Sequence, residues 1–97
     1  MSYVFEITDK SGRKIHLSEK QWAHIRKKHP EIEDFEMLKE GIEKFDKVTN
    51  YGYDPSVHYF YKHFKHKQPP NRYLCIAIKY LNGEGYIITA YFDKNIK

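Results

Sequence analysis

The stretch RYLCIAIKYL-NGEG-YIITAYF, residues 72–92, decides the fold. Two runs rich in β-branched and aromatic residues flank a short Asn/Gly cluster, and this pattern strongly indicates a β-hairpin. Side chains on successive residues of a strand point to opposite faces, and in both runs one of these faces is more apolar than the other. We therefore expect an antiparallel hairpin with one face in the core and a less apolar face available for function.

The turn determines which hairpin residues share a face. An odd-length loop, with Gly85 in a bulged or left-handed conformation, keeps apolar residues opposite one another, whereas a two-residue Asn82-Gly83 loop would mix the faces. We expect the odd loop. The pairs are then Tyr80 with Tyr86, Ile78 with Ile88 and Ile76 with Ala90, and Thr89, Tyr91, Lys79 and Tyr73 lie together on the less apolar face.

The length of 97 residues suits one domain, placed at 1–97. The lone Cys75 cannot form an internal disulfide, and its apolar surroundings predict a small buried residue in a reducing compartment. The chain has no apolar run that approaches about 18 residues and does not begin with a basic segment followed by an apolar core. These features predict a cytoplasmic protein with no membrane partner.

The net charge of +4 is unevenly distributed, and aromatic residues are abundant, with nine Tyr and six Phe. Acidic residues crowd positions 31–46, whereas none occurs between Asp54 and Glu84. A basic patch suits a phosphate-bearing partner such as RNA, and a solvated surface is the equally compatible alternative. The candidate RNA-binding cations in this part of the chain are Arg72, Lys65, Lys67 and Lys79.

The remaining elements follow from local patterns. Residues 3–8 and 13–17 flank a turn and predict a short N-terminal hairpin. Ser18 and Gln21 fit a capping box, so a helix should begin there and end near His29, because Pro30 disfavours helical geometry in its predecessor. Apolar residues at helical spacing in 35–45 predict a second helix, and strands are expected from 48 and at 57–64. The expected fold is α+β, with two N-terminal helices packed on one face of a four-stranded antiparallel sheet and a short N-terminal hairpin at or beside its edge.

The histidines do not have the spacing of metal ligands. His24 and His29 are separated by about 140° around a helix, and His58 and His63 have opposite parity on a strand. No metal site and no other cofactor are expected. His29, beside Trp22, is by default a buried structural residue and His24 a solvated one, although either could act as a general acid or base.

The chain contains no phosphate-cradling glycine loop, paired-carboxylate site or nucleophile elbow. What remains is a strand face with Thr89 and Tyr91, beside a histidine-bearing helix. Lys62 is the candidate cation, but both faces of residues 57–64 are partly apolar, so the pattern does not assign it to a face. Metal-free RNA cleavage uses such groups, because a base must deprotonate the ribose 2′-OH while hydroxyl and cationic groups stabilise the charge on the phosphate. The alternative is that Thr89 and Tyr91 are ordinary strand residues.

Three blocks in this order carry a family resemblance: WAHIRKKHPE (22–31), then YFYK (59–62) followed by YLCIAIK (73–79), then IITAYF (87–92) before the final NIK. Together they resemble the small phage-type domains of the Barnase, EndoU, Colicin E5/D and RelE-like (BECR) nuclease class, over residues 15–97. The resemblance implies two helices followed by a four-stranded antiparallel sheet.

The resemblance also implies a function, which is metal-independent endoribonuclease activity of toxin type. Carried over by position, His24 and His29 would supply the acid/base group, Lys62 the cation, and Thr89 and Tyr91 the hydroxyls at the phosphate. RNA, with tRNA as a candidate, and a cognate inhibitor protein would be the partners. Two other functions fit the same fold, namely a non-catalytic RNA-binding module and a protein-interaction module.

Overall fold

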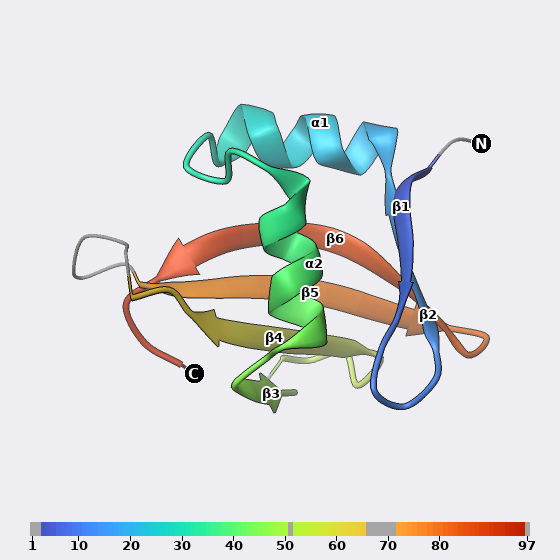
Figure 1. Ribbon diagram of the computed structural model, residues 1–97. Helices are drawn as coiled ribbons and strands as arrows, with labels where there is room; N and C mark the ends of the chain where they lie inside the picture. Colours follow the sequence, from blue (N-terminus) through green and yellow to red (C-terminus); the bar gives the residue numbers. More distant parts are fainter. Residues whose placement is uncertain (1–2, 51, 66–71, 97) are drawn as a thin grey trace.

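Strands from both ends of the chain meet in one six-stranded sheet (Figure 1). The computed structural model describes residues 3–50, 52–65 and 72–96. In chain order, the elements are β1 (Tyr3–Thr8), β2 (Lys14–Ser18), α1 (Glu19–Lys28), α2 (Phe35–Glu43), β3 (Lys47–Thr49), β4 (Val57–His63), β5 (Tyr73–Leu81) and β6 (Glu84–Asp93).

The strand order is β1-β2-β6-β5-β4-β3, and the β2–β6 pair is parallel. The expected four-stranded antiparallel sheet is therefore wrong, although the α+β class agrees with the structure. The N-terminal hairpin joins the sheet through two pairs, Ile15 with Gly85 and His16 with Tyr86. Gly85 permits this contact, because a Cβ there would lie 2.5 Å from Ile15 Cδ1 and 2.9 Å from Ile78 Cγ2.

The β5–β6 turn also differs from the expectation. It is the two-residue loop Asn82-Gly83, with φ of 53° and 79°, as a type I′ hairpin turn requires. A two-residue loop alone would mix the apolar and less apolar faces, but a bulge further along β6 prevents this. It shifts the register so that Ile78 pairs with Ile87 and Ala77 pairs with Thr89. The bulge places Tyr86 on the same face as Thr89 and Tyr91.

Each helix begins at an N-cap side chain, and that of α1, Ser18, is the predicted one. Ser18 Oγ accepts a hydrogen bond from the Gln21 backbone N–H (3.1 Å), and Asp34 Oδ1 accepts one from Glu36 (2.9 Å). The Gln21 side chain does not reach back as a capping box requires, because its amide donates to the Ile88 carbonyl on the free edge of β6 (2.9 Å). Neither helix in the described residues is long and apolar enough to cross a bilayer.

The helices pack on one face of the sheet, with α2 crossing β4 and β5 and α1 running beside β6 (Figure 1). The core lies between these layers and includes Ile25, Leu38 and Ile76, all fully buried. Aromatic residues are sorted between the two faces. All six Phe belong to this core or pack against it, whereas Tyr80 is the one tyrosine of the core in the described part of the chain.

The other sheet face, which neither helix covers, is called the open face here (Figure 1). It carries Tyr73, Cys75, Ala77 and Lys79 of β5 and the residues paired with them on β4 and β6. Tyr59, Tyr73 and Tyr91 are partly exposed there, as suits a ring with a polar hydroxyl, whereas Tyr61 is fully buried. The cross-strand rows of the open face are His63–Tyr73–Asp93, Tyr61–Cys75–Tyr91 and Tyr59–Ala77–Thr89.

Candidate functional site

The structure brings His29 into contact with Tyr91. His29 caps the C-terminus of α1, and its backbone N–H still donates to the Ile25 carbonyl (2.7 Å). Its ring centroid lies 5.8 Å from that of Tyr91 on β6, with 38° between the ring planes. The side chain is 31% exposed, and its Nδ1 lies 3.6 Å from Glu31 Oε2.

Thr89 lies next to Tyr91 on the open face. The two residues pair with Ala77 and Cys75, so small side chains stand opposite both hydroxyl-bearing ones. Thr89 and Tyr91 are each partly exposed. His29, Tyr91 and Thr89 form what we call the β6 cluster.

A second aromatic row adjoins this cluster at the end of the sheet. His63 and Tyr73 pair across β4 and β5, with ring centroids 5.0 Å apart. Tyr73 is a diagonal neighbour of Tyr91, a relation that places Cβ atoms about 7 Å apart or less. The sequence suggests no role for His63 beyond that of a metal ligand, because its cross-strand row cannot be known before the register is fixed. In the described residues, no group of three or more His, Cys, Asp or Glu could hold a metal ion.

Arg26 shapes the loop that carries His29, and sequence reasoning missed it. Its Nη1 donates to the backbone carbonyls of Pro30 (2.8 Å) and Ile32 (2.6 Å), while its guanidinium lies 6.0 Å from the Trp22 ring centroid. Both carbonyls follow the helix end, so the two hydrogen bonds from this one nitrogen fix the path of the chain there. The position gave no signal in sequence, because an exposed Arg in the last helical turn usually serves only the helix dipole.

Lys62 is not part of the β6 cluster. It lies on the helix-covered side of β4. Its Cβ is 3.8 Å from the position that a Cβ added at Gly41 of α2 would occupy. Its Nζ lies 3.9 Å from Asp46 Oδ2 and 3.4 Å from the His63 carbonyl. The structure thus separates Lys62 from Thr89 and Tyr91, which occupy the opposite face. His24 lies exposed on α1 and is not brought to the cluster by the contacts described above.

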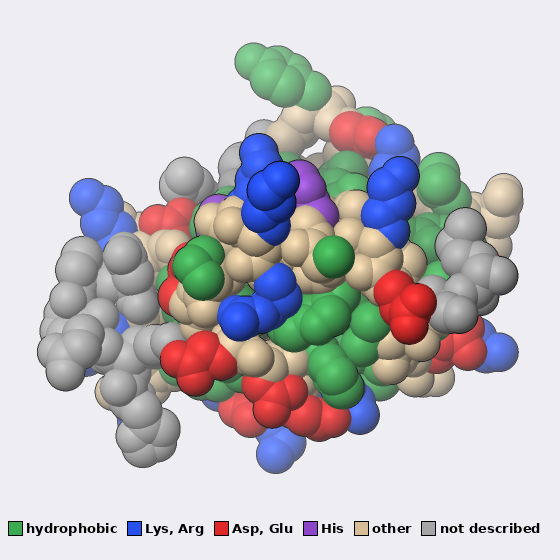
Figure 2. Space-filling view, turned by 90° about the horizontal axis from the view of Figure 1, so that it is seen from above, with side chains coloured by type: hydrophobic (Ala, Val, Ile, Leu, Met, Phe, Trp, Pro, Cys, Tyr) green, Lys and Arg blue, Asp and Glu red, His purple; other side chains and the backbone are tan. Residues whose placement is uncertain are grey.

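The predicted RNA-binding cations are scattered. Lys79 lies on the open face, with its Nζ 3.2 Å from Asp54 Oδ2. Lys65 is exposed in the turn after β4, and Lys67 lies outside the described residues. Arg72 precedes β5, and its buried Nε has no hydrogen-bond partner among the described residues. A different basic surface exists on α1, because Lys and Arg side chains lie along its outer side while acidic side chains gather at the margin over α2 (Figure 2). The exposed cations of α1 are Lys20, Arg26, Lys27 and Lys28.

His16 forms another constellation that the sequence did not reveal. It is 4% exposed, with Nδ1 2.6 Å from Glu6 Oε2 and Nε2 2.5 Å from Glu84 Oε1. Its ring is stacked between Tyr3 (4.7 Å between centroids) and Tyr86 (5.1 Å). Burial, together with the nearby Glu84 carboxylate, raises the pKa of Tyr86. Three strands must align to assemble this stack, so no local pattern predicts it.

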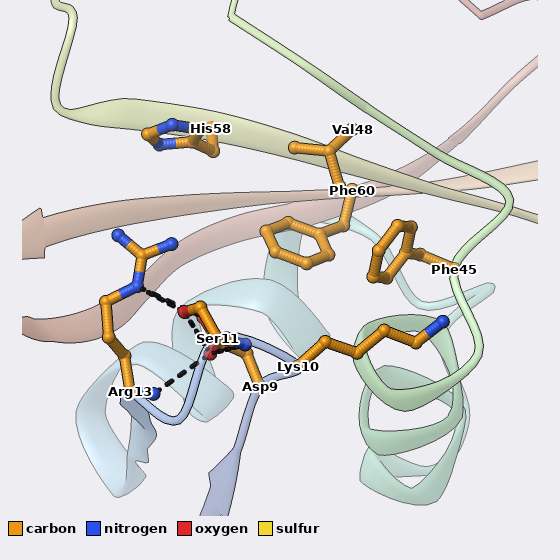
Figure 3. A pocket seen from close by; sticks show the side chains of 8 residues that line it. All are labelled: Asp9, Lys10, Ser11, Arg13, Phe45, Val48, His58 and Phe60. Carbon is orange, nitrogen blue, oxygen red and sulfur yellow. Dashed lines mark hydrogen bonds and ion pairs between the residues drawn. The ribbon is translucent and has the colours of Figure 1, made fainter.

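A shallow hollow of about 150 Å³ lies on the helix side, between the β1–β2 turn and β4 (Figure 3). Phe45 and Phe60 form its apolar part, and Arg13 and Lys10 lie at its rim. Beside it, Asp9 accepts hydrogen bonds from Ser11, Arg13 and the Tyr80 hydroxyl. Burial alone would raise the pKa of Asp9, but these hydrogen bonds together outweigh it and lower the pKa. Burial, followed by the hydrogen bond to Asp9, raises the pKa of Tyr80.

None of the predicted catalytic residues lines this hollow. His58 does line it, and its buried Nδ1 has no hydrogen-bond partner in the part of the chain that the structure describes. The candidate functional site is therefore the β6 cluster with the adjoining His63–Tyr73 row, on the other face of the sheet. No family model, curated protein or solved structure matches the chain.

Proposed function

We propose that the protein is a metal-independent endoribonuclease that cleaves RNA at the β6 cluster. The observation that carries the proposal is the contact between His29 and Tyr91, next to Thr89. Residues far apart in sequence bring an imidazole and two hydroxyl groups to one partly exposed place. The reaction needs these groups, because proton transfer and stabilisation of a charged phosphate together lower its barrier.

In the proposed reaction, His29 removes the proton of the ribose 2′-OH, and Glu31 supports the imidazolium that forms. The 2′-oxygen attacks the adjacent phosphorus, the bond from phosphorus to the 5′-oxygen breaks, and the leaving oxygen takes up a proton. The products are a 2′,3′-cyclic phosphate and a 5′-hydroxyl. Tyr91 and Thr89 donate hydrogen bonds to the phosphate oxygens, and the basic end of α1 adds favourable charge.

The test is incubation of the purified protein with total RNA and with tRNA in EDTA, followed by identification of the new ends. We expect cyclic phosphate ends from the parent. His29→Gln should reduce cleavage at least about hundredfold, as expected when a general base is lost, while its urea unfolding curve stays close to that of the parent. His24→Gln, on the exposed part of the same helix, is the matched control and should cleave normally. Intact RNA from the folded parent would refute the proposal.

A non-catalytic RNA-binding module is the second candidate. Tyr59, Tyr73 and Tyr91 of the open face favour it, since partly exposed rings on a sheet are surfaces on which unpaired bases stack. Binding of RNA that weakens steeply with salt and is never followed by cleavage would select this function. The toxin role implied by the resemblance has its own readout, which is growth arrest on expression of the parent but not of His29→Gln.

A further inference from the structure

A crevice opens beside the β6 cluster, at the point where β2 and β6 separate. The two parallel strands pair only from Ile15 to His16 and from Gly85 to Tyr86. Beyond these pairs, β2 passes into α1 at Ser18 while β6 continues through its bulge. A hollow of about 430 Å³ remains between them, which we call the β2–β6 crevice. Its walls include Tyr3, His16, Ser18, Gln21, Tyr86 and Ile88.

One wall of the crevice is an aromatic stack that is firmly held. Tyr3, His16 and Tyr86 lie nearly parallel, with interplanar angles of 29° and 27°. His16 Nε2 is hydrogen-bonded to Glu84 Oε1, and Glu6 Oε2 lies 2.6 Å from its Nδ1. A preorganised wall of flat rings favours a flat, unsaturated ligand, because little conformational freedom is lost when the ligand binds.

Ser18 and Gln21, which also line the crevice, offer specific hydrogen-bonding groups. Ser18 Oγ already accepts from the Gln21 backbone, which leaves its O–H to donate. Gln21 Nε2 donates to the Ile88 carbonyl, so the amide is oriented and its Oε1 can still accept. A donor and an acceptor from adjacent turns of one segment match the edge of a nucleobase, which presents both kinds of group side by side.

The crevice lies in line with the β6 cluster. Tyr86, Thr89 and Tyr91 share the open face because of the bulge. At a strand rise of about 3.3 Å per residue, Tyr91 lies roughly 10 Å beyond Ile88. This span is comparable to one nucleotide, so a base in the crevice would leave its sugar and phosphate near the cluster.

We propose that the β2–β6 crevice binds one unpaired nucleobase of the RNA, so that the substrate is single-stranded RNA. The inference rests on the proposed function, because it places a base subsite next to the cleavage site. An A-form duplex keeps its bases stacked and paired, and its strands would have to open before a base could enter.

The test uses an oligonucleotide that cannot be cleaved. A 2′-O-methyl RNA with 2-aminopurine at one position lacks the attacking hydroxyl, and the fluorescence of 2-aminopurine falls when it stacks on an aromatic ring. Tyr86→Ala removes a wall, and Ile88→Trp fills the crevice from a 38% exposed position while keeping the stack. Each should weaken binding about fivefold or more, the effect of losing one stacked base. Tyr86→Phe keeps the ring and should quench and bind as the parent does.

Tyr53→Ala is the surface control, since Tyr53 is fully exposed and lies outside the crevice. If the parent cleaves RNA but Ile88→Trp and Tyr86→Ala bind the probe as tightly as the parent, the subsite is refuted and the nuclease proposal stands. If the folded parent binds no probe and cleaves no RNA at low salt, both proposals are refuted. Equal affinity of the parent for the probe and for its duplex would also overturn the single-strand preference.

Discussion

Two aspartates organise turns through the same local pattern, Asp-x-Ser. Asp9 accepts hydrogen bonds from the backbone and hydroxyl of Ser11, and Asp54 accepts the same pair from Ser56. Each carboxylate then takes one distant partner, because the Tyr80 hydroxyl donates to Asp9 (3.0 Å) and Lys79 pairs with Asp54 (3.2 Å). The contacts between each aspartate and its serine can be predicted from sequence. The contacts with Tyr80 and Lys79 depend on strand pairing, so they cannot be predicted in this way.

These contacts predict how stability depends on pH. Hydrogen bonds from Ser56, followed by the contact with Lys79, lower the pKa of Asp54 to about 2, from an ordinary value of 3.8. The unfolded chain therefore binds more protons in this range, so the stabilisation is complete above about pH 4 and is lost as pH falls towards 2. Asp9, whose pKa is also lowered, contributes in the same direction.

We expect urea unfolding, followed by circular dichroism between pH 5 and pH 2, to show a free energy of unfolding that falls as the pH is lowered. Asp54→Asn should be less stable than the parent at pH 5 and should approach it at pH 2, because the parent loses its charged carboxylate there. Glu33→Gln, at an exposed position, is the control and should keep the slope of the parent. A constant difference between parent and Asp54→Asn across the range would contradict this explanation.

At the scale of the elements, the residues at the two ends of α1 determine where the helix begins and how the loop that carries His29 runs. Ser18 at its start was predicted from local sequence, as was the end near Pro30. The role of Arg26 was not predictable, because its acceptors are backbone carbonyls whose positions depend on the loop path. The bulge in β6 was missed for a similar reason. The sequence shows a conflict of parity, but either an odd loop or a bulge can resolve it, and only packing against β5 selects between them.

Arg26 is predicted to be a positioning residue for His29. Arg26→Lys keeps the charge but loses the guanidinium nitrogen that donates to both carbonyls, so the helix end should lose about 1–3 kcal/mol of stability. The NMR resonances of the His29 imidazole should also shift, because the ring of Tyr91 lies 5.8 Å away and any displacement alters its ring current. Lys27→Gln, in the same turn, is the matched control and should change neither. Unchanged His29 resonances in Arg26→Lys would show that the hydrogen bonds from Arg26 to the two carbonyls do not position the His29 ring.

At the scale of the whole molecule, the parallel β2–β6 pair makes the two ends of the chain parts of one structure. The sequence predicted the N-terminal hairpin but placed it at or beside a smaller sheet, since no local sequence pattern indicates that residues 15–16 pair with 85–86. Periodicity found the two helices, the central strands and most of the core. It could not assign Lys62 to a face, and the structure places Lys62 across the sheet from the β6 cluster. The proposed site therefore lies on the open face alone, without Lys62, and His29 contacts it from the end of α1.

This architecture predicts that the N-terminal hairpin unfolds together with the central sheet. Ile15 and Leu17 of β2 are fully buried in the same core as Ile76 and Ile78 of β5. Native-state hydrogen exchange should thus give the hydrogen-bonded amides of β2 and β5 similar opening free energies. Ile15→Ala should reduce both by about 2–5 kcal/mol, as for other buried truncations, while Ile88→Ala, at a partly exposed position, should reduce them much less. Exchange in β2 that is much faster than in β5, with an Ile15→Ala effect confined to the hairpin, would mean that two parallel pairs do not couple the strands. The β2–β6 crevice would then open with the hairpin, and a base bound there would protect the β2 amides first.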